Sequence, residues 1–306
     1  MSAIQNDWRA DAAAAAQRMR LRGFDYVMRN NGGYLSQICS AAEIFAFLYG
    51  RAMRIGPSAA PMIPGPFTGN PGPNNPDYAN GGLYNGAPGP DFDRFIFSPA
   101  HYALVLYVAL IEHGRLAPEA LEQFNQDGSR MELIGAEHSP GVESTTGSLG
   151  QALSQAMGVA LGRRMKGEAG AVWVMMSDGE FQEGQTWEAL QALSHYRLGS
   201  VRIIVDVNAQ QCDGAMADVM RIEPLAERAA AFGANAHDID GHDFAAMERA
   251  LDSADAERPL LILARTDPAR GVPLMNERAP VLHYLRFSSD DERARYQAAF
   301  DAMAGA

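Results

Sequence analysis

The sequence has one lysine, two cysteines and no long apolar run, and each shortage argues against a class of function. Lys166 is the single lysine, and 25 basic against 37 acidic residues give a formal net charge of −12. A general nucleic-acid binder would instead show a basic face to the phosphates. Cys39 and Cys212 form no CxxC pair and no zinc-type cluster, so we interpret them as reduced thiols.

The N-terminal stretch and the hydropathy pattern argue against a membrane protein. No window approaches the ~20 apolar residues that a membrane span needs. The Ala-rich start, with interspersed arginines, reads as an amphipathic helix rather than a signal peptide. We therefore expect a cytoplasmic protein that binds neither membranes nor nucleic acid.

The chain reads as a single domain over residues 1–306, because no interior linker divides it. Its 306 residues, 47% of them hydrophobic, can bury a sizeable core. Helices are expected at 8–28 and 40–50. The Pro-, Gly- and Asn-rich stretch at about 56–91 has no hydrophobic period and is either a functional lid or a disordered segment.

Strands and helices alternate through the rest of the chain, which predicts a doubly wound parallel sheet. The buried strands are short apolar runs without polar alternation. The expected strands are 94–97, 171–176, 201–207, 235–239 and 259–264. The expected helices are 102–113, 149–164, 185–197, 223–232 and 243–254.

Polar residues follow two of these strands where each strand ends. Asp178 and Gly179 come after the strand at 171–176, and Asn208 follows the strand at 201–207. Since one helix joins the two strands, their carboxyl ends should form one crevice, where ligands of such sheets bind. A carboxylate, an amide and a backbone carbonyl suit a hard cation that brings phosphate oxygens of its own. An ordinary Asp-Gly turn at the strand end is the alternative.

Three blocks around this crevice resemble the thiamine-diphosphate motif of transketolases. They are Ser177-Asp178-Gly179-Glu180-Phe181-Gln182-Glu183-Gly184, Trp187-Glu188-Ala189 and Asn208-Ala209-Gln210. The resemblance implies that Asp178 and Asn208, with the main-chain carbonyl of Gln210, bind Mg²⁺ or Ca²⁺. It also assigns Gly179 and Glu180 to cofactor binding. Ser177 replaces the usual first glycine of the motif.

Other blocks agree with the resemblance, which covers almost the whole chain. Residues 141–150 are similar to the segment that lies against the cofactor and contribute Gly147, Ser148 and Leu149. Residues 93–101 resemble the block whose histidine contacts the diphosphate, here His101. His283 matches a cofactor-facing histidine with looser spacing. As catalytic candidates we take both histidines together with Glu183 and Glu188. The two glutamates match a glutamate network at the family's subunit interface. The alternative is that they are two ordinary charges near a helix start, where carboxylates are favoured.

Two channel histidines of the family are replaced in this chain. Asn30 stands where the early Gly-His block has its histidine, and Ala136 stands at the second position, with only His138 nearby. An amide cannot shuttle a proton near neutral pH. We therefore assign Asn30 and His138 to the expected substrate channel. These replacements and the long 56–91 stretch all lie near the expected substrate entrance, which suggests a substrate other than a standard sugar phosphate.

The resemblance also implies an architecture and an activity. The implied architecture is the diphosphate-binding domain of the thiamine-diphosphate-binding fold, with helices on both faces of the sheet. The implied reaction is transfer of a two-carbon ketol unit from a ketose or ketose phosphate to an aldehyde. The family's pyrimidine-binding domain is absent, so a separate C-terminal-like subunit should supply it within a heterotetramer. The alternatives are a carboligase or synthase that uses a 2-keto acid, a non-catalytic cofactor-binding paralogue, and a nucleotide-binding module, which lacks its GxGxxG or P-loop signature here.

Overall fold

The computed structural model describes residues 7–75 and 78–305. Residues 1–6 and 306, at the ends of the predicted domain, and residues 76–77, inside the predicted 56–91 stretch, lie outside the described residues. Among the described residues, no helix has the length and apolarity needed to cross a lipid bilayer.

Five parallel strands form the central sheet, in the order β2-β3-β4-β8-β7. All five were predicted from the sequence, and their ends differ from the prediction by one residue at most. The sheet is buried on both sides, because neighbouring residues such as Trp173 and Val174 belong to different hydrophobic clusters. The strands are β2 (Arg94–Phe97), β3 (Val172–Ser177), β4 (Val201–Val207), β7 (Asn235–Asp240) and β8 (Leu260–Arg265).

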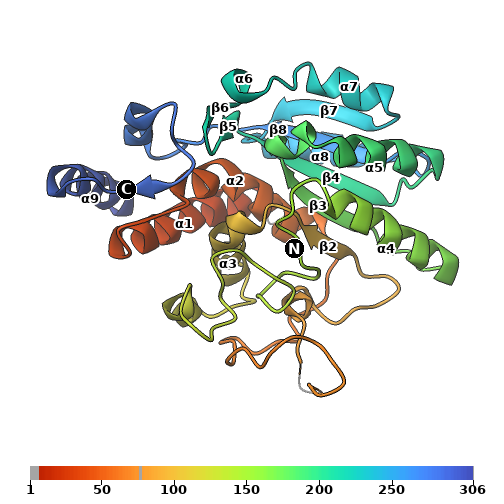
Figure 1. Ribbon diagram of the computed structural model, residues 1–306, viewed down its shortest axis with the longest axis horizontal. Coiled ribbons are helices and arrows are strands. Elements are labelled where there is room, and N and C mark those ends of the chain that lie inside the picture. The colour runs from red at the N-terminus through yellow and green to blue at the C-terminus, as the bar shows by residue number, and fades with distance from the viewer. Residues whose placement is uncertain (1–6, 76–77, 306) are drawn as a thin grey trace, which may run out of the picture.

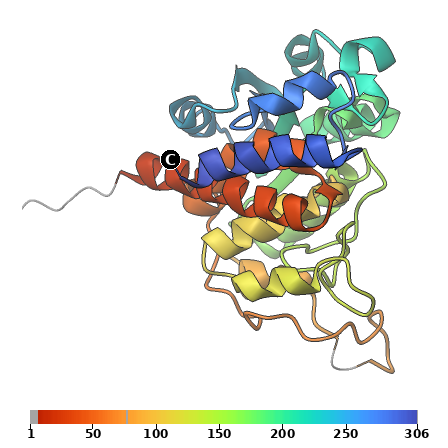
Figure 2. The same cartoon turned by 90° about the vertical axis from the view of Figure 1, so that its left-hand side faces the viewer.

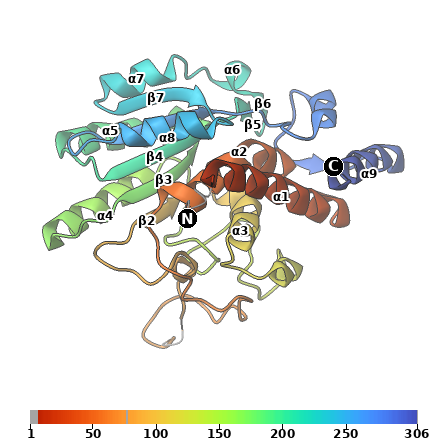
Figure 3. The same cartoon turned by 180° about the vertical axis from the view of Figure 1, so that it is seen from behind.

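Helices cover both faces of this sheet, as Figures 1 and 3 show from opposite sides. The predicted doubly wound α/β fold is therefore confirmed. One face carries α4 (Ala152–Lys166), α5 (Gly184–His195) and α7 (Leu225–Ala231). The other face carries α1 (Trp8–Arg29), α2 (Leu35–Phe47), α3 (Ala103–Glu112) and α8 (Phe244–Asp252).

The C-terminal helix α9 (Asp290–Ala304) packs along α1, so the first and last described helices lie side by side (Figure 2). The ring of Phe24 contacts Tyr296 and Phe300 edge-on, with centroid distances of 6.3 and 5.5 Å. This helix was not predicted. Ser289 caps its first turn by accepting a hydrogen bond from the Glu292 amide, at 3.1 Å.

Two small antiparallel ladders lie outside the main sheet. β1 (Gly32–Gly33) pairs with β9 (Leu285–Arg286), and β5 (Gln210–Gln211) pairs with β6 (Gly214–Ala215), which leads into the short helix α6 (Met216–Val219). Gly32 is required by the first ladder, because a Cβ atom there would lie 2.5 Å from the carbonyl oxygen of Leu285. This close approach joins the start of the chain to its C-terminal quarter.

The 56–91 stretch is mostly irregular and lies over the segment that follows α3 (Figure 1). Its backbone is attached at several points, two of which are the hydrogen bonds from the Phe67 amide to Gly128 and from the Gly81 amide to Glu137, at 2.8 and 2.6 Å. The stretch contains one 3-10 turn, Gly81–Asn85. The described part of the loop is therefore held to residues that lead directly into the expected cofactor segment.

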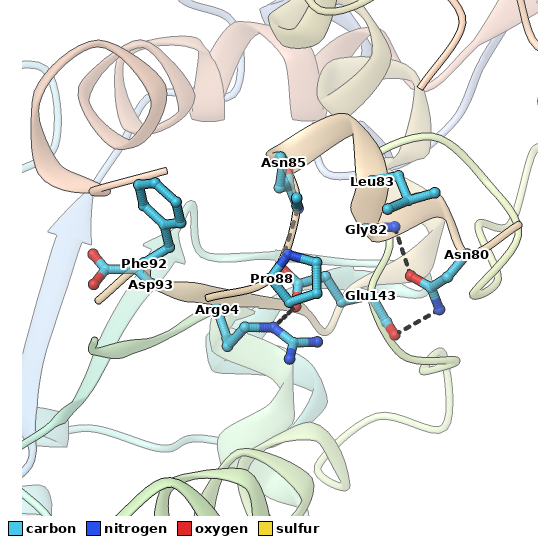
Figure 4. Close-up of a pocket in the computed structure, with 11 residues that line it drawn as sticks. Asn80, Gly82, Leu83, Asn85, Pro88, Phe92, Asp93, Arg94 and Glu143 are labelled. Atoms are coloured by element: carbon cyan, nitrogen blue, oxygen red, sulfur yellow. Dashed lines mark hydrogen bonds and ion pairs between the residues drawn. The ribbon is translucent and has the colours of Figure 1, made fainter. Parts of the chain in front are cut away.

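The end of this loop closes around the buried carboxylate of Glu143, beside a small cavity of about 180 Å³ (Figure 4). Glu143 forms an ion pair with Arg94 and accepts hydrogen bonds from the Phe95 amide at 2.9 Å and from Asn85 Nδ2 at 3.3 Å. Asn80 Nδ2 donates to the Glu143 carbonyl oxygen at 3.1 Å. One carboxylate thus joins the loop, the start of β2 and residues 141–150.

Candidate cofactor site

The two predicted ligand residues lie side by side at the carboxyl edge of the sheet. Ser177 of β3 and Asp206 of β4 are register partners, so the residues that follow them emerge together. Asp178 begins a 3-10 turn, and its Oδ2 accepts a hydrogen bond from the Ala209 amide at 2.8 Å. Asn208 is buried beside it. The expected meeting of the two strand tips is therefore present.

A cavity of about 290 Å³ opens at this edge. It brings together Asp178, Gly179 and Gln210 from the predicted motif with both predicted histidines, Leu149 and Glu183. None of its lining residues is a lysine or an arginine. The lining residues are His101, Tyr102, Leu149, Ser177, Asp178, Gly179, Gln182, Glu183, Gln210, Gln211, Cys212, Asp213 and His283.

The acidic end of this cavity is strongly desolvated. Only 2% of Asp178 and none of Asp206 is exposed to solvent. Burial, reinforced by the neighbouring Asp206 carboxylate, raises the pKa of Asp178 to about 8. Burial also raises the pKa of Asp206, which four hydrogen-bond donors partly offset. Two buried carboxylates without a basic neighbour favour a cation, because a cation restores the charge that desolvation penalises.

Asp206 fixes the orientation of the Asn208 amide. Asp206 accepts hydrogen bonds from the hydroxyl groups of Ser40 at 2.6 Å, Tyr102 at 2.9 Å and Thr266. The amide nitrogen of Asn208 donates to Asp206 at 3.0 Å and to the Tyr102 hydroxyl oxygen at 2.9 Å. The amide oxygen is thereby directed away from this network, which suits a ligand for a hard cation.

The turn after Asn208 has a left-handed backbone at a residue that is not glycine. Ala209 has φ = 57°, a conformation that L-residues rarely adopt and that clusters at functional sites. The turn lets the Gln210 amide donate to Asn208 Oδ1 at 2.9 Å. The Gln210 Oε1 atom is buried without a hydrogen-bond partner. An unpartnered oxygen on the cavity wall indicates space for a polar ligand.

His101 and His283 both line the cavity, with their ring centroids 5.1 Å apart. Burial, with a smaller contribution from His283, lowers the pKa of His101 to about 3. Burial also lowers the pKa of His283. Gln37 Nε2 donates to the His283 carbonyl oxygen at 3.0 Å and lies 3.3 Å from Nδ1. Both imidazoles are therefore neutral at pH 7.

The 147–150 segment borders the cavity, but Glu180 does not line it. Leu149 is on the wall, and Gly147 packs against the residue before His101, because a Cβ atom there would lie 3.2 Å from Ala100 Cβ. Ser148 is exposed and accepts a hydrogen bond from Gln151 at 2.8 Å. Glu180 is fully buried and accepts hydrogen bonds from the Ser177 and Gly150 amides and the Ser98 hydroxyl.

Glu180 therefore lies beneath the site and joins three cofactor-facing segments. Gly150 is needed at this junction, because its φ is 83° and a Cβ atom would lie 2.7 Å from Glu183 Cβ. Glu183 lines the cavity, whereas Glu188 lies on the outer side of α5 beside a groove that includes His195 and Phe232. The two glutamates thus face different spaces.

Neither predicted channel residue is among the cavity-lining residues. The Asn30 side chain donates to the Tyr26 carbonyl oxygen at 2.9 Å and caps α1. His138 is buried under Phe67 of the 56–91 stretch, with ring centroids 4.3 Å apart, and its Nε2 lies 3.1 Å from Glu132. The structure places these two side chains in local packing rather than on the wall of the cavity.

The residues absent from the sequence-based set fall into two groups. Asp206 lies two residues before Asn208 on a strand, so the period-two alternation could have placed both on one face. Tyr102, next to His101, carried no separate signal. Ser40, Thr266, Tyr34 and Gln37 reach the site from distant parts of the chain and could not be found by spacing.

The donor set fits a cation that is completed by its ligand. Among residues 7–75 and 78–305, no cluster of three or more His, Cys, Asp or Glu side chains could hold a metal ion alone. Asp178, Asn208 and the Gln210 carbonyl could offer one carboxylate and two neutral oxygens, so a cation held there would take its remaining oxygens from a ligand such as a phosphate. Fold and site together define an α/β protein with an acidic, histidine-bearing cavity at the carboxyl edge of its parallel sheet.

Comparison with known proteins identifies the family. Residues 85–297 match the family model described as transketolase, thiamine diphosphate binding domain. The chain is 41% identical over 198 residues to the transketolase family protein y4mO of Sinorhizobium fredii, an alignment that covers 63% of this chain and 71% of the relative. It is 31% identical over 242 residues to the 6-deoxy-6-sulfo-D-fructose transketolase subunit SqwG of a Clostridium species, with 78% of each covered. The chain belongs to the transketolase family and carries its thiamine-diphosphate-binding domain.

Solved transketolases share the fold over almost the whole chain. The transketolase of Campylobacter jejuni superposes with a TM-score of 0.72 at 21% identity, covering 96% of this chain and 47% of that one. The chain likewise covers 37% of the length of human transketolase-like protein 2. It therefore spans less than half of these longer relatives.

Proposed function

We propose that the chain is the cofactor-binding subunit of a two-chain transketolase-type transferase. It would move a two-carbon ketol unit from a ketose or ketose-phosphate donor to an aldehyde acceptor. The observation that carries this proposal is the pairing of Asp178 and Asn208 at neighbouring strand tips, next to a cavity that Asp178, His101 and His283 line together. Family membership supports the same cofactor and reaction class.

The chain's own groups divide the work of holding the cofactor. Asp178, the Asn208 amide oxygen and the Gln210 carbonyl would hold Mg²⁺ or Ca²⁺, which neutralises the diphosphate. Gly179 leaves its backbone open to the phosphates, since the nearest atom to an added Cβ is the Gln211 side chain at 3.3 Å. Gly147, Ser148 and Leu149 would border the rings. Bound thiamine diphosphate supplies the carbon nucleophile that takes up the two-carbon unit.

The two imidazoles and the two glutamates are assigned the remaining catalytic roles. Because His101 and His283 are neutral at pH 7, each can accept a proton, or donate an N–H hydrogen bond, at the reacting oxygens without first losing a proton to solvent. His101 would also contact the diphosphate. Glu183 on the cavity wall and the exposed Glu188 would belong to a carboxylate network that extends toward a neighbouring subunit.

A partner chain would complete the active site. SqwG is named as a transketolase subunit and is covered over 78% of its length, which supports a split enzyme here. The partner would carry the pyrimidine-binding domain and the carboxylate that activates the cofactor, in a heterotetramer with two copies of each chain. We propose a cytoplasmic location for the complex.

A second candidate is a carboligase or synthase that takes its two-carbon unit from a 2-keto acid. The positions of Asn30 and His138 favour it, because both side chains are engaged in local contacts and neither lines the cavity. A sugar substrate would therefore meet fewer proton-transferring groups on this chain.

Calorimetry with the partner subunit tests the cofactor assignment. We expect thiamine diphosphate to bind in Mg²⁺ and the Asp178→Ala variant to lose most of that binding, with Asp213→Ala as an exposed control on the same cavity. Absence of binding, or equal binding by the Asp178→Ala variant, would overturn the proposal. Assaying the reconstituted pair with ketose phosphates and with 2-keto acids then separates the two candidate reactions.

A further inference from the structure

Within the described part of the chain, Tyr34 is the one aromatic residue whose ring contacts both imidazoles of the site. Its ring centroid lies 5.7 Å from that of His101 and 5.5 Å from that of His283. Since the two imidazoles are themselves 5.1 Å apart, the three rings form a closed triangle. The ring planes of Tyr34 and His283 meet at 84°, an edge-on geometry that aromatic rings favour.

The fold places Tyr34 there through the ladder of β1 and β9. Gly32 and Gly33 pair with Arg286 and Leu285, so the residue after β1 comes to lie beside the residues before β9. No side chain could replace the hydrogen of Gly32 at this separation, as noted above. The close approach of two distant segments thus serves to bring a tyrosine against His283.

The other contacts of the triangle hold it from behind. Tyr284 packs edge-on against Tyr34, with centroids 4.9 Å apart and an angle of 90°. Gln37 holds the backbone and the ring of His283. Burial raises the pKa of Tyr34, with contributions from Tyr284 and Cys212, so its hydroxyl group is neutral. The triangle is therefore an uncharged, packed unit on one wall of the cavity.

We propose that Tyr34 is a positioning residue of the cofactor site, whose ring fixes the imidazoles of His101 and His283 against each other. This inference rests on the proposed function only for its kinetic consequence. The imidazoles are the proton-transferring groups of the cavity, and loss of their mutual placement would reduce turnover without removing the cation ligands. Neither Asn30 nor His138 lines the cavity. His101 and His283 are therefore the two histidines among its lining residues, and no other histidine takes their place.

The test compares Tyr34→Ala with Tyr34→Phe. Phe keeps the ring and removes the hydroxyl group, so it should restore whatever the ring provides. The first readout is the histidine ring NMR spectrum of the cofactor-free full-length chain. Of the seven histidines, His101 and His283 are assigned with His101→Gln and His283→Gln. We expect the ring signals of His101 and His283 to shift and broaden in Tyr34→Ala and to stay near their wild-type positions in Tyr34→Phe. The ring signals of the other five histidines should be unchanged in both variants.

The second readout is activity of the complex with the partner subunit. We expect kcat to fall about tenfold or more in Tyr34→Ala, with thiamine diphosphate affinity within about twofold of wild type. Unchanged His101 and His283 signals in Tyr34→Ala, or a Tyr34→Phe variant that behaves like Tyr34→Ala, would overturn the proposal. If Tyr34→Ala does not fold, Tyr34→Leu removes the ring while filling most of the space, and the same outcomes decide.

The two proposals fail separately. The NMR comparison requires no cofactor, so it decides the role of Tyr34 even if the wild-type complex binds no thiamine diphosphate. Conversely, unperturbed imidazoles in Tyr34→Ala would leave the cation site at Asp178 and the proposed reaction intact.

Discussion

Replacing Asp178 by asparagine should stabilise the cofactor-free chain while removing its response to the cofactor. Asparagine has nearly the same shape and its side-chain oxygen can still accept the hydrogen bond from the Ala209 amide. It carries no charge, so it avoids the cost of desolvating a carboxylate next to Asp206. The cation-binding carboxylate is lost in the same change.

The magnitude follows from the pKa of Asp178, which is about 8 in the folded chain against 3.8 for the unfolded one. A group whose pKa is higher when folded binds more protons in the folded state between these two values, so the free energy of unfolding falls as the pH rises from about 4 to about 8. The full difference at pH 7 corresponds to about 4 kcal/mol. Relaxation and water in the cavity reduce it, so we expect a gain on the order of 2–3 kcal/mol.

The assay is denaturant unfolding of the isolated chain in EDTA at pH 7 and at pH 4.5, with thermal unfolding in parallel. Asp178→Asn should be more stable at pH 7, with an apparent Tm higher by roughly 4–8 °C. At pH 4.5 the gain should fall to about a quarter of its value at pH 7, because the pH is then close to the unfolded pKa. Adding Mg²⁺ and thiamine diphosphate should stabilise the wild type and leave the variant unchanged. Asp213→Asn, an exposed carboxylate on the same cavity, is the control and should show neither effect.

A pH-independent effect of Asp178→Asn would refute the electrostatic reasoning, because an uncharged cause does not depend on pH. A loss of stability at pH 7 in EDTA would refute it as well, since it would mean that the carboxylate is favourable without a cation. A variant that keeps the Mg²⁺-dependent thermal shift would remove Asp178 from the cation site.

Two further predictions concern His101 and Glu143. The pKa of His101 is lower in the folded chain, so the folded state binds fewer protons and the free energy of unfolding falls as the pH drops from about 6.5 toward 3. Between pH 7 and pH 4.5, His101→Gln should therefore lose about 1–2 kcal/mol less of this free energy than the wild type does. The exposed control His195→Gln should lose as much as the wild type. Glu143→Gln weakens the ion pair with Arg94, so the free energy of unfolding measured in urea should fall by about 1–3 kcal/mol and a protease should cleave faster within residues 56–91. The exposed control Glu119→Gln should change neither quantity. Unaltered cleavage would mean that Glu143 does not anchor the loop.

The sheet could be predicted because its signals are local and strong. The apolar runs at 94–97 and 201–207 give the bounds of β2 and β4 as the structure has them. A strand buried on both faces needs continuous apolar residues, and few other segments of this chain have them. The two strand tips followed from the same runs, and with them the positions of Asp178 and Asn208.

The helix predicted at 40–50 is present, but it begins five residues earlier than predicted. α2 begins at Leu35, and a π-helical turn over Leu48–Ala52 follows it. Its first residues include Gln37 and Ser40, which are buried although they are polar. They form hydrogen bonds with His283 and Asp206, so long-range polar contacts replace the apolar stripe by which an amphipathic helix is recognised. Local pattern fails here because distant partners satisfy the polar groups.

The missed C-terminal helix has a related cause. Within α9, Tyr296 is the single residue in the buried class, so the sequence shows almost no apolar face. Its stabilising contacts with Phe24 come from the opposite end of the chain. The β1–β9 ladder is equally invisible, since each strand has two residues. Both features depend on long-range pairing, and the ladder places Tyr34 against His283.

The residues that line the cavity supply no lysine or arginine to bind an anion. They include Asp178, Glu183 and Asp213 and two neutral imidazoles. A diphosphate could not be attracted to such a wall by direct charge pairing, because both sides are anionic or neutral. On the proposed function, a divalent cation would reverse this sign, because it would balance the buried Asp178 and Asp206 carboxylates and take further oxygens from the diphosphate. Cofactor affinity should therefore depend on the cation far more steeply than on either His101 or His283.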